Sequence, residues 1–228
     1  MNTKLALFSH HLVNDVIVER FNNLKKLNPN WDVRPVGFEG YDLLPNSIIV
    51  NKDKYPTNNL LKDYSIQKSA DWCDPDLYLY DAYIQYPQYD AYFLYEYDTI
   101  CNVSIDEFFD TSLDFFGNNI VVPGEESWWW VEQYRKLNPH NSVFDKLYAY
   151  GQSTCIYMTN KILKHCVAEV IKNKHLYCEM LSEIRGGTLV KQVTDLKKGR
   201  HDISNYISWT LNEINVDLSK NYFYHPIK

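Results

Sequence analysis

The sequence predicts a single α/β domain in which helices flank a mostly parallel central sheet. Residues 4–37 read as a strand, a helix and a strand in succession, which is how a parallel sheet begins. Residues 89–98 are apolar and aromatic almost without a break, which is typical of a central strand buried on both faces. The chain has 228 residues, enough for one such domain with a sizeable core. No repeat, low-complexity tract or linker divides it.

The first three elements follow from apolar runs and the polar residues that end them. Lys4–Ser9 is a short apolar run before a polar turn and predicts the first strand. Asp15–Leu27 predicts a helix, because its apolar residues recur at helical spacing and Asn14 can cap its start. An Asn-Pro pair beginning at Asn28 ends that helix. Trp31–Gly37 then predicts the second strand.

The middle of the chain contains the predicted central strand. Asp76–Tyr86 predicts a helix with one apolar face, which Pro87 ends. Tyr89–Asp98 is the strand itself. The pattern next predicts a short helix over Asp106–Phe109, a strand over Ile120–Pro123 and a helix over Trp128–Leu137.

The last third alternates between helical and extended patterns. It predicts a strand over Tyr148–Met158 that is interrupted at 151–153, a helix over Lys161–Asn173, a helical or turn-like segment over Cys178–Ile184, a helix over Ile203–Ile214 and an aromatic closing strand within Tyr222–Lys228.

Composition excludes two classes of partner. The formal net charge is −6 and the chain has no basic stripe, so nucleic acid is not an expected partner. No window approaches the roughly 20 apolar residues of a membrane span, so we expect no stable membrane insertion. The 5 cysteines include no Cys-x-x-Cys pair, which favours a reducing compartment. Because the first residues also lack the apolar length of a signal peptide, we expect a cytoplasmic protein.

Two carboxylates end the predicted central strand. Glu96 and Asp98 are two residues apart, so on a strand their side chains point to the same face. Such a pair can hold a hard divalent cation through oxygen. Ligands of open α/β sheets bind outside the carboxyl ends of the strands, which is where these acids are expected. The alternative interpretation is a pair of solvated acids in a loop.

The segment Gln88–Thr99 (QYDAYFLYEYDT), with the helix predicted before it, resembles the core of GT-A glycosyltransferases. In that family a strand of this kind is closed by a metal motif, usually Asp-x-Asp. Glu96 stands here at the first position of the motif, and Asp98 stands at the second, which carries most of the metal binding. The resemblance implies one Rossmann-like GT-A domain over residues 1–228, similar to small transferases of bacteria and large DNA viruses.

The same resemblance implies an activity. We expect a hexosyl- or deoxyhexosyltransferase that moves a sugar from a nucleotide-sugar, UDP-linked, to a glycan or glycoprotein acceptor. Its cofactor would be Mn²⁺ or Mg²⁺. The nucleotide-binding part is expected at about residues 1–100 and the acceptor-binding part at about residues 101–228. If the protein is viral, the expected location is the host cytoplasm.

The closing segment YFYHPIK is similar to the last residues of many GT-A enzymes. There the His completes the metal shell and the Lys contacts the diphosphate, which implies these roles for His225 and Lys228. Imidazole is an acceptable ligand for Mn²⁺, and an ammonium group is a suitable point charge for phosphate. A disordered tail is the alternative, although three aromatic rings at 222–224 are costly to leave in solvent.

In inverting GT-A enzymes an acidic residue at the start of a helix, after the acceptor-binding loops, acts as the base. Glu179 matches that position best, and Glu183 is the second candidate, one turn along the same helix face. A carboxylate at this place can take the proton of the acceptor hydroxyl while the sugar carbon is attacked. The resemblance therefore implies inversion of the anomeric centre. An ordinary exposed glutamate is the competing interpretation of either residue.

The resemblance also implies contacts to the nucleotide. The loop after the first strand of GT-A folds holds the base and ribose, which makes Ser9 and His10 candidates. Trp72 and Asp76 lie where similar enzymes place further contacts. A metal site at the adjacent His10 and His11 is not expected, because neighbouring side chains diverge.

Asp74-Pro75-Asp76 is a second Asp-x-Asp string. A proline at a helix start, flanked by aspartates, is typical of helix capping. We therefore interpret this string as a cap and do not assign the metal to it.

Two other classes of function share parts of this pattern. A non-catalytic, lectin-like module would also use aromatic rings and could hold a metal, but it has no need of a parallel α/β chain. A sugar nucleotidyltransferase would be expected to have a Gly-rich phosphate loop near the first strand, and no such cluster occurs among the 8 glycines. Release of sugar from the donor to water with Mn²⁺ would separate a transferase from a lectin.

Overall fold

The computed structural model describes residues 3–55, 74–116, 122–123, 129–139, 147–149, 155–177, 180–197, 207–208 and 223–224. Its centre is a six-stranded sheet with the strand order β3-β2-β1-β4-β9-β6. These strands are β1 (Lys4–Ser9), β2 (Asp32–Phe38), β3 (Ile48–Val50), β4 (Ala91–Glu96), β6 (Phe115–Phe116) and β9 (Cys155–Thr159). Within this sheet β9 runs opposite to the other five strands, so the predicted mostly parallel sheet is confirmed.

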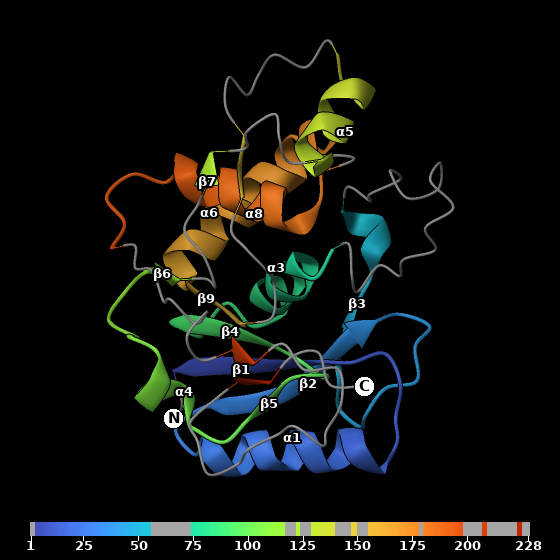
Figure 1. Cartoon of the computed structure of the whole chain (residues 1–228), viewed down its shortest axis with the longest axis vertical. Coiled ribbons are helices and arrows are strands. Elements are labelled where there is room, and N and C mark those ends of the chain that lie inside the picture. The colour runs from blue at the N-terminus through green and yellow to red at the C-terminus, as the bar shows by residue number, and fades with distance from the viewer. Residues whose placement is uncertain are drawn as a thin grey trace.

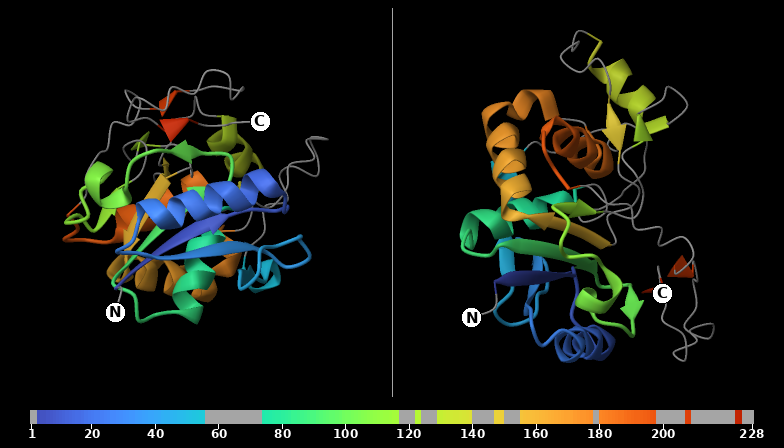
Figure 2. Two further views of the ribbon diagram at one scale, coloured as in Figure 1. Left: turned by 90° about the horizontal axis from the view of Figure 1, so that it is seen from below. Right: turned by 90° about the vertical axis from the view of Figure 1, so that its left-hand side faces the viewer.

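Helices cover both faces of the sheet, as predicted (Figure 1, Figure 2). One face carries α1 (Asp15–Leu27), and the other carries α3 (Asp76–Gln85), α6 (Asn160–Lys172) and α8 (Ser182–Gln192). None of the helices in the described ranges has both the length and the apolar character needed to cross a membrane.

The remaining described elements are short. They are η1 (Lys52–Lys54), β5 (Ile100–Cys101), α4 (Ile105–Phe108), β7 (Val122–Pro123), α5 (Trp129–Leu137), β8 (Tyr148–Ala149), α7 (Lys174–Tyr177), β10 (Ile207–Ser208) and β11 (Phe223–Tyr224). The short strands form two small sheets, with the orders β10-β11-β5 and β7-β8. Through β11 and β5, the last described residues pair with the segment that follows β4.

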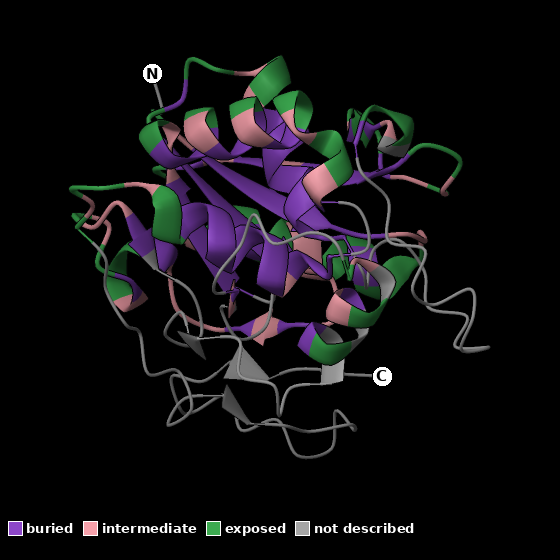
Figure 3. Ribbon diagram, turned by 90° about the horizontal axis from the view of Figure 1, so that it is seen from above, coloured by how far each residue is buried: buried purple, intermediate pink, exposed green. Residues whose placement is uncertain are grey.

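The sheet separates two hydrophobic clusters, because successive side chains of its central strands alternate between the faces. On β4, Tyr92 and Leu94 belong to the cluster under α3, α6 and α8, whereas Phe93 and Tyr95 belong to the cluster under α1. β1 alternates in the same way, and both strands are almost fully inaccessible to solvent (Figure 3). This two-sided burial explains why β4 is apolar and aromatic without a break.

Local sequence signals placed several elements accurately. β1 and α1 have the predicted bounds, and the Asn14 side chain caps α1 by accepting a 2.9 Å hydrogen bond from the Ile17 amide. The Asn28 amide donates back to the Leu24 carbonyl at the other end, 3.2 Å away. A capping box at Ser104 starts α4 one residue earlier than predicted.

Two predictions in the second half of the chain are wrong in part. Ile207–Ser208, which the pattern placed in a helix over 203–214, forms strand β10, because it pairs with β11; the rest of that prediction lies outside the described residues. The helix expected near 178–184 begins at Ser182 and continues to Gln192. Its interior contains Gly186 and Gly187, which are poor helix formers, but both are buried, and packing outweighs their propensity.

Gly37 on β2 lets the chain after β1 approach the sheet closely. The His10 amide donates a 3.0 Å hydrogen bond to the Val36 carbonyl beside it. A Cβ atom at Gly37 would lie 2.7 Å from the His10 carbonyl oxygen and 2.3 Å from Leu43 Cδ2. The leucine methyl can move, whereas the carbonyl belongs to the backbone.

We therefore predict that Gly37→Ala lowers the free energy of unfolding by about 1–3 kcal/mol, as overpacking does. Urea denaturation followed by circular dichroism measures this change. Adding Leu43→Ala to the Gly37→Ala chain relieves the contact with the leucine side chain but not the contact with the carbonyl. The double variant should therefore stay less stable than Leu43→Ala alone. Equal stabilities of these two variants would show that the backbone contact does not matter.

Candidate active site at the carboxyl edge of the sheet

Three parallel strands end together at one edge of the sheet. Ser9, the last residue of β1, is in register with Val36 of β2 on one side and with Glu96 of β4 on the other. Ser9 is buried, and its hydroxyl donates to the Tyr95 carbonyl at 3.4 Å. The edge beyond these strand ends is where open α/β sheets bind their ligands. It brings the predicted residues Ser9 and Glu96 side by side.

The chain turns sharply after β4. The strand ends at Glu96, and the Thr99 amide closes a turn by donating to the Glu96 carbonyl at 3.1 Å. Arg20 of α1 holds this turn, because its Nη1 donates to the Tyr97 carbonyl at 3.1 Å. Asp98 therefore lies in a turn, and the expectation that it shares a strand face with Glu96 is wrong. Both carboxylates remain at the edge and are partly exposed.

Thr99 places a polar atom in the interior of this turn. Its side chain is buried, and its Oγ1 has no hydrogen-bond partner in the part of the chain that the structure describes. A buried hydroxyl that lacks a partner is costly, so such groups in native proteins usually meet a ligand, an ion or a water molecule. Sequence reasoning did not name Thr99, although it follows the two acids directly.

Glu183 brings a further carboxylate to the same edge. It lies in the first turn of α8, where its Oε2 is 3.2 Å from the Ser182 hydroxyl, which donates to it. Burial, with smaller contributions from the negative charges of Glu96 and Asp76, raises the pKa of Glu183 to about 7. Glu96 at the end of β4 therefore lies within electrostatic range of the start of α8. The first-choice base, Glu179, lies outside the described residues.

The string Asp74-Pro75-Asp76 is an ion-pair site, so its interpretation as a helix cap is wrong. Pro75 precedes α3 without any side-chain capping bond. Asp74 and Asp76 instead accept hydrogen bonds from the buried guanidinium of Arg185, at 2.9 Å and 2.5 Å from its Nη2. The tertiary structure decides this outcome, because Arg185 is more than a hundred residues away. A contact between Asp76 and a nucleotide stays a prediction.

The two adjacent histidines have different surroundings. His10 is buried: its Nδ1 lies 3.2 Å from the Leu12 carbonyl, and its Nε2 lies 3.4 Å from the Leu44 amide. Because an amide can only donate, Nε2 accepts and Nδ1 carries the proton. The His11 ring meets the Tyr97 ring edge-on at 4.7 Å and lies 6.1 Å from the Tyr41 ring. His11, which the sequence argument set aside, thus joins aromatic residues that follow β2 and β4.

The oxygen atoms at this edge could hold a hard divalent cation whose remaining ligands come from a phosphate group. Glu96, Asp98 and Thr99 offer oxygen atoms only. Within the described ranges, no group of three or more His, Cys, Asp or Glu side chains could hold a metal. Magnesium commonly binds one or two carboxylates and takes its other ligands from water and substrate phosphates. The predicted His225 and Lys228, like Trp72, lie outside the described residues and stay predictions.

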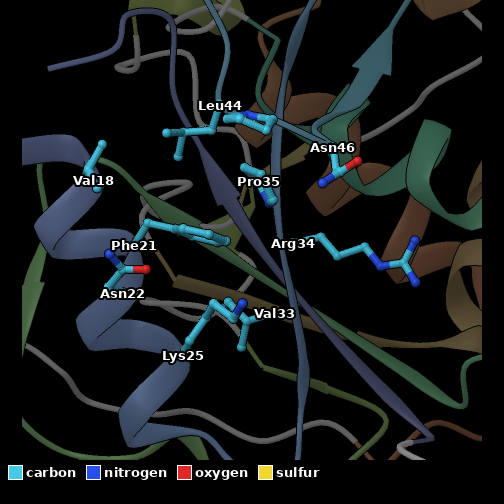
Figure 4. Close-up of a pocket in the computed structure, with 10 residues that line it drawn as sticks. Val18, Phe21, Asn22, Lys25, Val33, Arg34, Pro35, Leu44 and Asn46 are labelled. Carbon is cyan, nitrogen blue, oxygen red and sulfur yellow. The ribbon is translucent and has the colours of Figure 1, made fainter.

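A pocket of about 430 Å³ lies elsewhere, between α1, β2 and the segment after β2. Figure 4 shows Val18 and Phe21 of α1 on one side and Val33 and Pro35 of β2 on the other. Asn22, Lys25, Arg34, Leu44, Pro45 and Asn46 complete its lining. No carboxylate lines this pocket and none of the predicted site residues takes part in it, so it is separate from the edge that carries Glu96 and Asp98.

Comparison with known proteins gives similarity only to solved structures. No protein-family model and no curated protein sequence matches the chain. A structure of the galactosyltransferase LgtC in complex with donor and acceptor sugar analogs is 12% identical, with a TM-score of 0.45 over 89% of this chain and 74% of that one. A structure of an active-site mutant of LgtC is 11% identical, with a TM-score of 0.46 over 97% and 86% of the two chains.

The buried His10 predicts a pH dependence of stability. Burial lowers the pKa of His10 below its ordinary value of 6.5, so the folded protein keeps the ring neutral. The unfolded chain takes up this proton as the pH falls through about 6.5. It then binds more protons than the folded state, and stability is lost as the pH falls from about 6.5 toward the folded pKa.

We predict that His10→Gln flattens the fall in unfolding free energy between pH 7 and pH 5. The contribution of one histidine is at most about 1.4 kcal/mol per pH unit. Urea denaturation at a series of pH values measures it, with His175→Gln at an exposed histidine as the matched control. If both variants keep the wild-type slope, His10 does not set this dependence.

Proposed function

We propose that this protein is a metal-dependent glycosyltransferase. It transfers a sugar from a nucleotide-sugar, UDP-linked, to a glycan or glycoconjugate acceptor, with inversion of the anomeric centre. The observation that carries this proposal is the group of acids at the carboxyl edge of the sheet. Glu96 ends the buried strand β4, Asp98 follows it in a tight turn, and Glu183 is coupled electrostatically to Glu96.

Glu96 and Asp98 would hold the cation, Mn²⁺ or Mg²⁺. The bound cation supplies charge neutralisation for the leaving diphosphate. Asp98 lies in the turn that the Arg20–Tyr97 hydrogen bond holds, so its carboxylate is attached to a constrained backbone. The Thr99 hydroxyl adds a neutral oxygen beside the pair, and a ligand at this edge would give its Oγ1 the partner that the described residues do not provide.

The nucleotide would lie over the strand ends next to Ser9. In the register of the sheet, Ser9 is the neighbour of Glu96, so a diphosphate held at Glu96 and Asp98 would extend toward the segment after β1. His11, Tyr41 and Tyr97 line this side with rings that suit stacking on a base. The buried His10 supports the segment from within.

Glu183 is the base that the described residues support. It lies in the first turn of α8, on the helical side of the sheet, and its pKa of about 7 suits proton transfer near neutral pH. From this position it would accept the proton of the attacking acceptor hydroxyl. One base opposite the leaving diphosphate is sufficient for a single displacement, which inverts the anomeric centre. Glu179, the other predicted base, is tested beside it.

We predict that Asp98→Asn removes cation-dependent nucleotide binding and keeps the fold. UDP with Mn²⁺ at 100 times its dissociation constant should stabilise the wild-type protein by roughly 2.7 kcal/mol. Thermal unfolding with and without UDP and Mn²⁺ should show that stabilisation in the wild type and none in Asp98→Asn. Asp106→Asn serves as the control, because Asp106 pairs with Lys4 at 2.9 Å at the start of β1. An unchanged response in Asp98→Asn would contradict the proposed metal site.

We predict that Glu183→Gln lowers kcat by ~10²–10⁴-fold, the usual cost of removing a general base, and leaves donor binding intact. Transfer and hydrolysis are followed by UDP release from UDP-glucose, UDP-galactose and UDP-N-acetylglucosamine, with Glu179→Gln measured in parallel. If only Glu179→Gln loses turnover, the base is Glu179 and not Glu183.

The reaction product and the UDP-release assay together decide between the proposed function and its alternatives. Proton NMR of the product gives the anomeric configuration, and a retained anomer would exclude the single displacement. A wild-type protein that binds UDP-sugars with Mn²⁺ but never releases UDP would instead be a sugar-binding module.

A further inference from the structure

Arg185 is a completely buried cation that joins the starts of two helices. It lies in α8 and is 0% exposed. Its Nε donates to Asp76 Oδ2 at 2.8 Å, while its Nη2 donates to Asp76 Oδ1 at 2.5 Å and to Asp74 Oδ1 at 2.9 Å. Asp76 is the first residue of α3 and Asp74 lies just before it. The guanidinium therefore binds the beginning of α3 in a bidentate and directional way.

The same residue also binds the segment that begins its own helix, through its side chain and its backbone amide. Nη1 donates to the Met180 carbonyl at 3.2 Å, and the Arg185 amide donates to the Leu181 carbonyl at 2.9 Å. Leu181, the residue that precedes α8, makes no side-chain cap. The first turn of α8, which contains Glu183, is thus held against α3 by the Arg185 fork and not by a conventional capping side chain.

Stability alone does not account for this arrangement. A buried ion cluster pays a large desolvation cost, and well-packed apolar residues of similar volume are often as stabilising. What a guanidinium fork provides and an apolar side chain does not is a fixed direction, since its donors match a carboxylate in only a few geometries. Here the direction that is fixed is that of the first turn of α8, which contains Glu183.

We infer that Arg185, with Asp74 and Asp76, is a positioning residue of the proposed active site: it holds the first turn of α8, which carries the proposed base Glu183. The inference rests on the proposed function. Arg185 itself is buried and each of its three side-chain nitrogens donates within the protein, so it acts on the reaction through the residues that it holds.

The test uses two variants of the full-length chain. Arg185→Lys keeps the charge but loses the bidentate fork. The triple variant Asp74→Asn, Asp76→Asn, Arg185→Met removes the buried charges together, so that no ion is left without a partner. Arg34→Lys is the control, because Arg34 also pairs with an aspartate, Asp32 at 2.8 Å, in a partly exposed position at the opposite end of the sheet where β2 begins.

Three quantities are measured for each variant: the melting temperature, the dissociation constant of UDP with Mn²⁺, and kcat for UDP release from the most active of the three UDP-sugars. We expect Arg185→Lys and the triple variant to lose about 10²-fold in kcat, the order of loss that a misplaced catalytic group causes. Nucleotide affinity should stay within threefold of wild type in Arg185→Lys, whereas the triple variant also changes the predicted nucleotide contact Asp76 and is compared by kcat and melting temperature only. Arg34→Lys should keep its kcat. A triple variant that melts at the wild-type temperature and also keeps the wild-type kcat would overturn the inference.

Hydrogen–deuterium exchange supplies a readout that does not depend on activity. The Ile184 and Arg185 amides donate to the Leu181 carbonyl at 3.0 Å and 2.9 Å. Their exchange rates should be higher than wild type in Arg185→Lys and equal to wild type in Arg34→Lys. If the triple variant does not fold, Arg185→Lys decides: unchanged exchange with unchanged kcat overturns the inference. A wild-type protein that releases no UDP would instead refute the proposed function, and with it the catalytic role, whereas exchange would still show whether Arg185 holds the turn.

Discussion

The parallel pairing of β1 with β4 is the constraint on which the rest of the structure depends. Six residues of each strand are in register, from Lys4 with Ala91 to Ser9 with Glu96. Since both strands are buried on both faces, every backbone donor and acceptor between them must pair, and a shift of one residue would send each side chain to the opposite cluster. The pairing therefore fixes the core and, at its last position, brings Ser9 beside the first acid of the site.

A second constraint joins the helical layer to that edge. The α8 helix packs above the sheet together with α3 and α6, and apolar packing alone would allow it to slide or rotate by small amounts. The Asp74–Arg185–Asp76 cluster is directional and buried, so it restricts such movement at the start of α8. Backbone hydrogen bonds between strands fix the residues at the strand edge. A buried network of charges fixes the start of α8.

Much of the fold could be read from local patterns, because those patterns report burial and capping directly. The apolar stripe of Asp15–Leu27 and its Asn14 cap were sufficient for α1, and the unbroken apolar run before Glu96 was sufficient for β4. The patterns failed where distant residues decide the outcome. Because Gly186 and Gly187 are poor helix formers, the local pattern did not predict the full length of α8, which is stabilised by its buried surroundings. Ile207–Ser208 forms a strand because it pairs with Phe223–Tyr224.

The sequence by itself determined the α/β class, the order of the first elements and the position of Glu96 and Asp98 at the end of a buried strand, because these depend on periodicity and local chemistry. Only the tertiary structure decided which polar residues meet. In the folded protein His10 is buried, and the His11 ring contacts the Tyr97 ring. Asp74 and Asp76, which the sequence suggested as a helix cap, pair with Arg185. The tertiary structure also places Glu183 at the start of α8, where burial raises its pKa. Contacts of this kind join residues far apart in the chain, and no local pattern encodes the three-dimensional packing that brings them together.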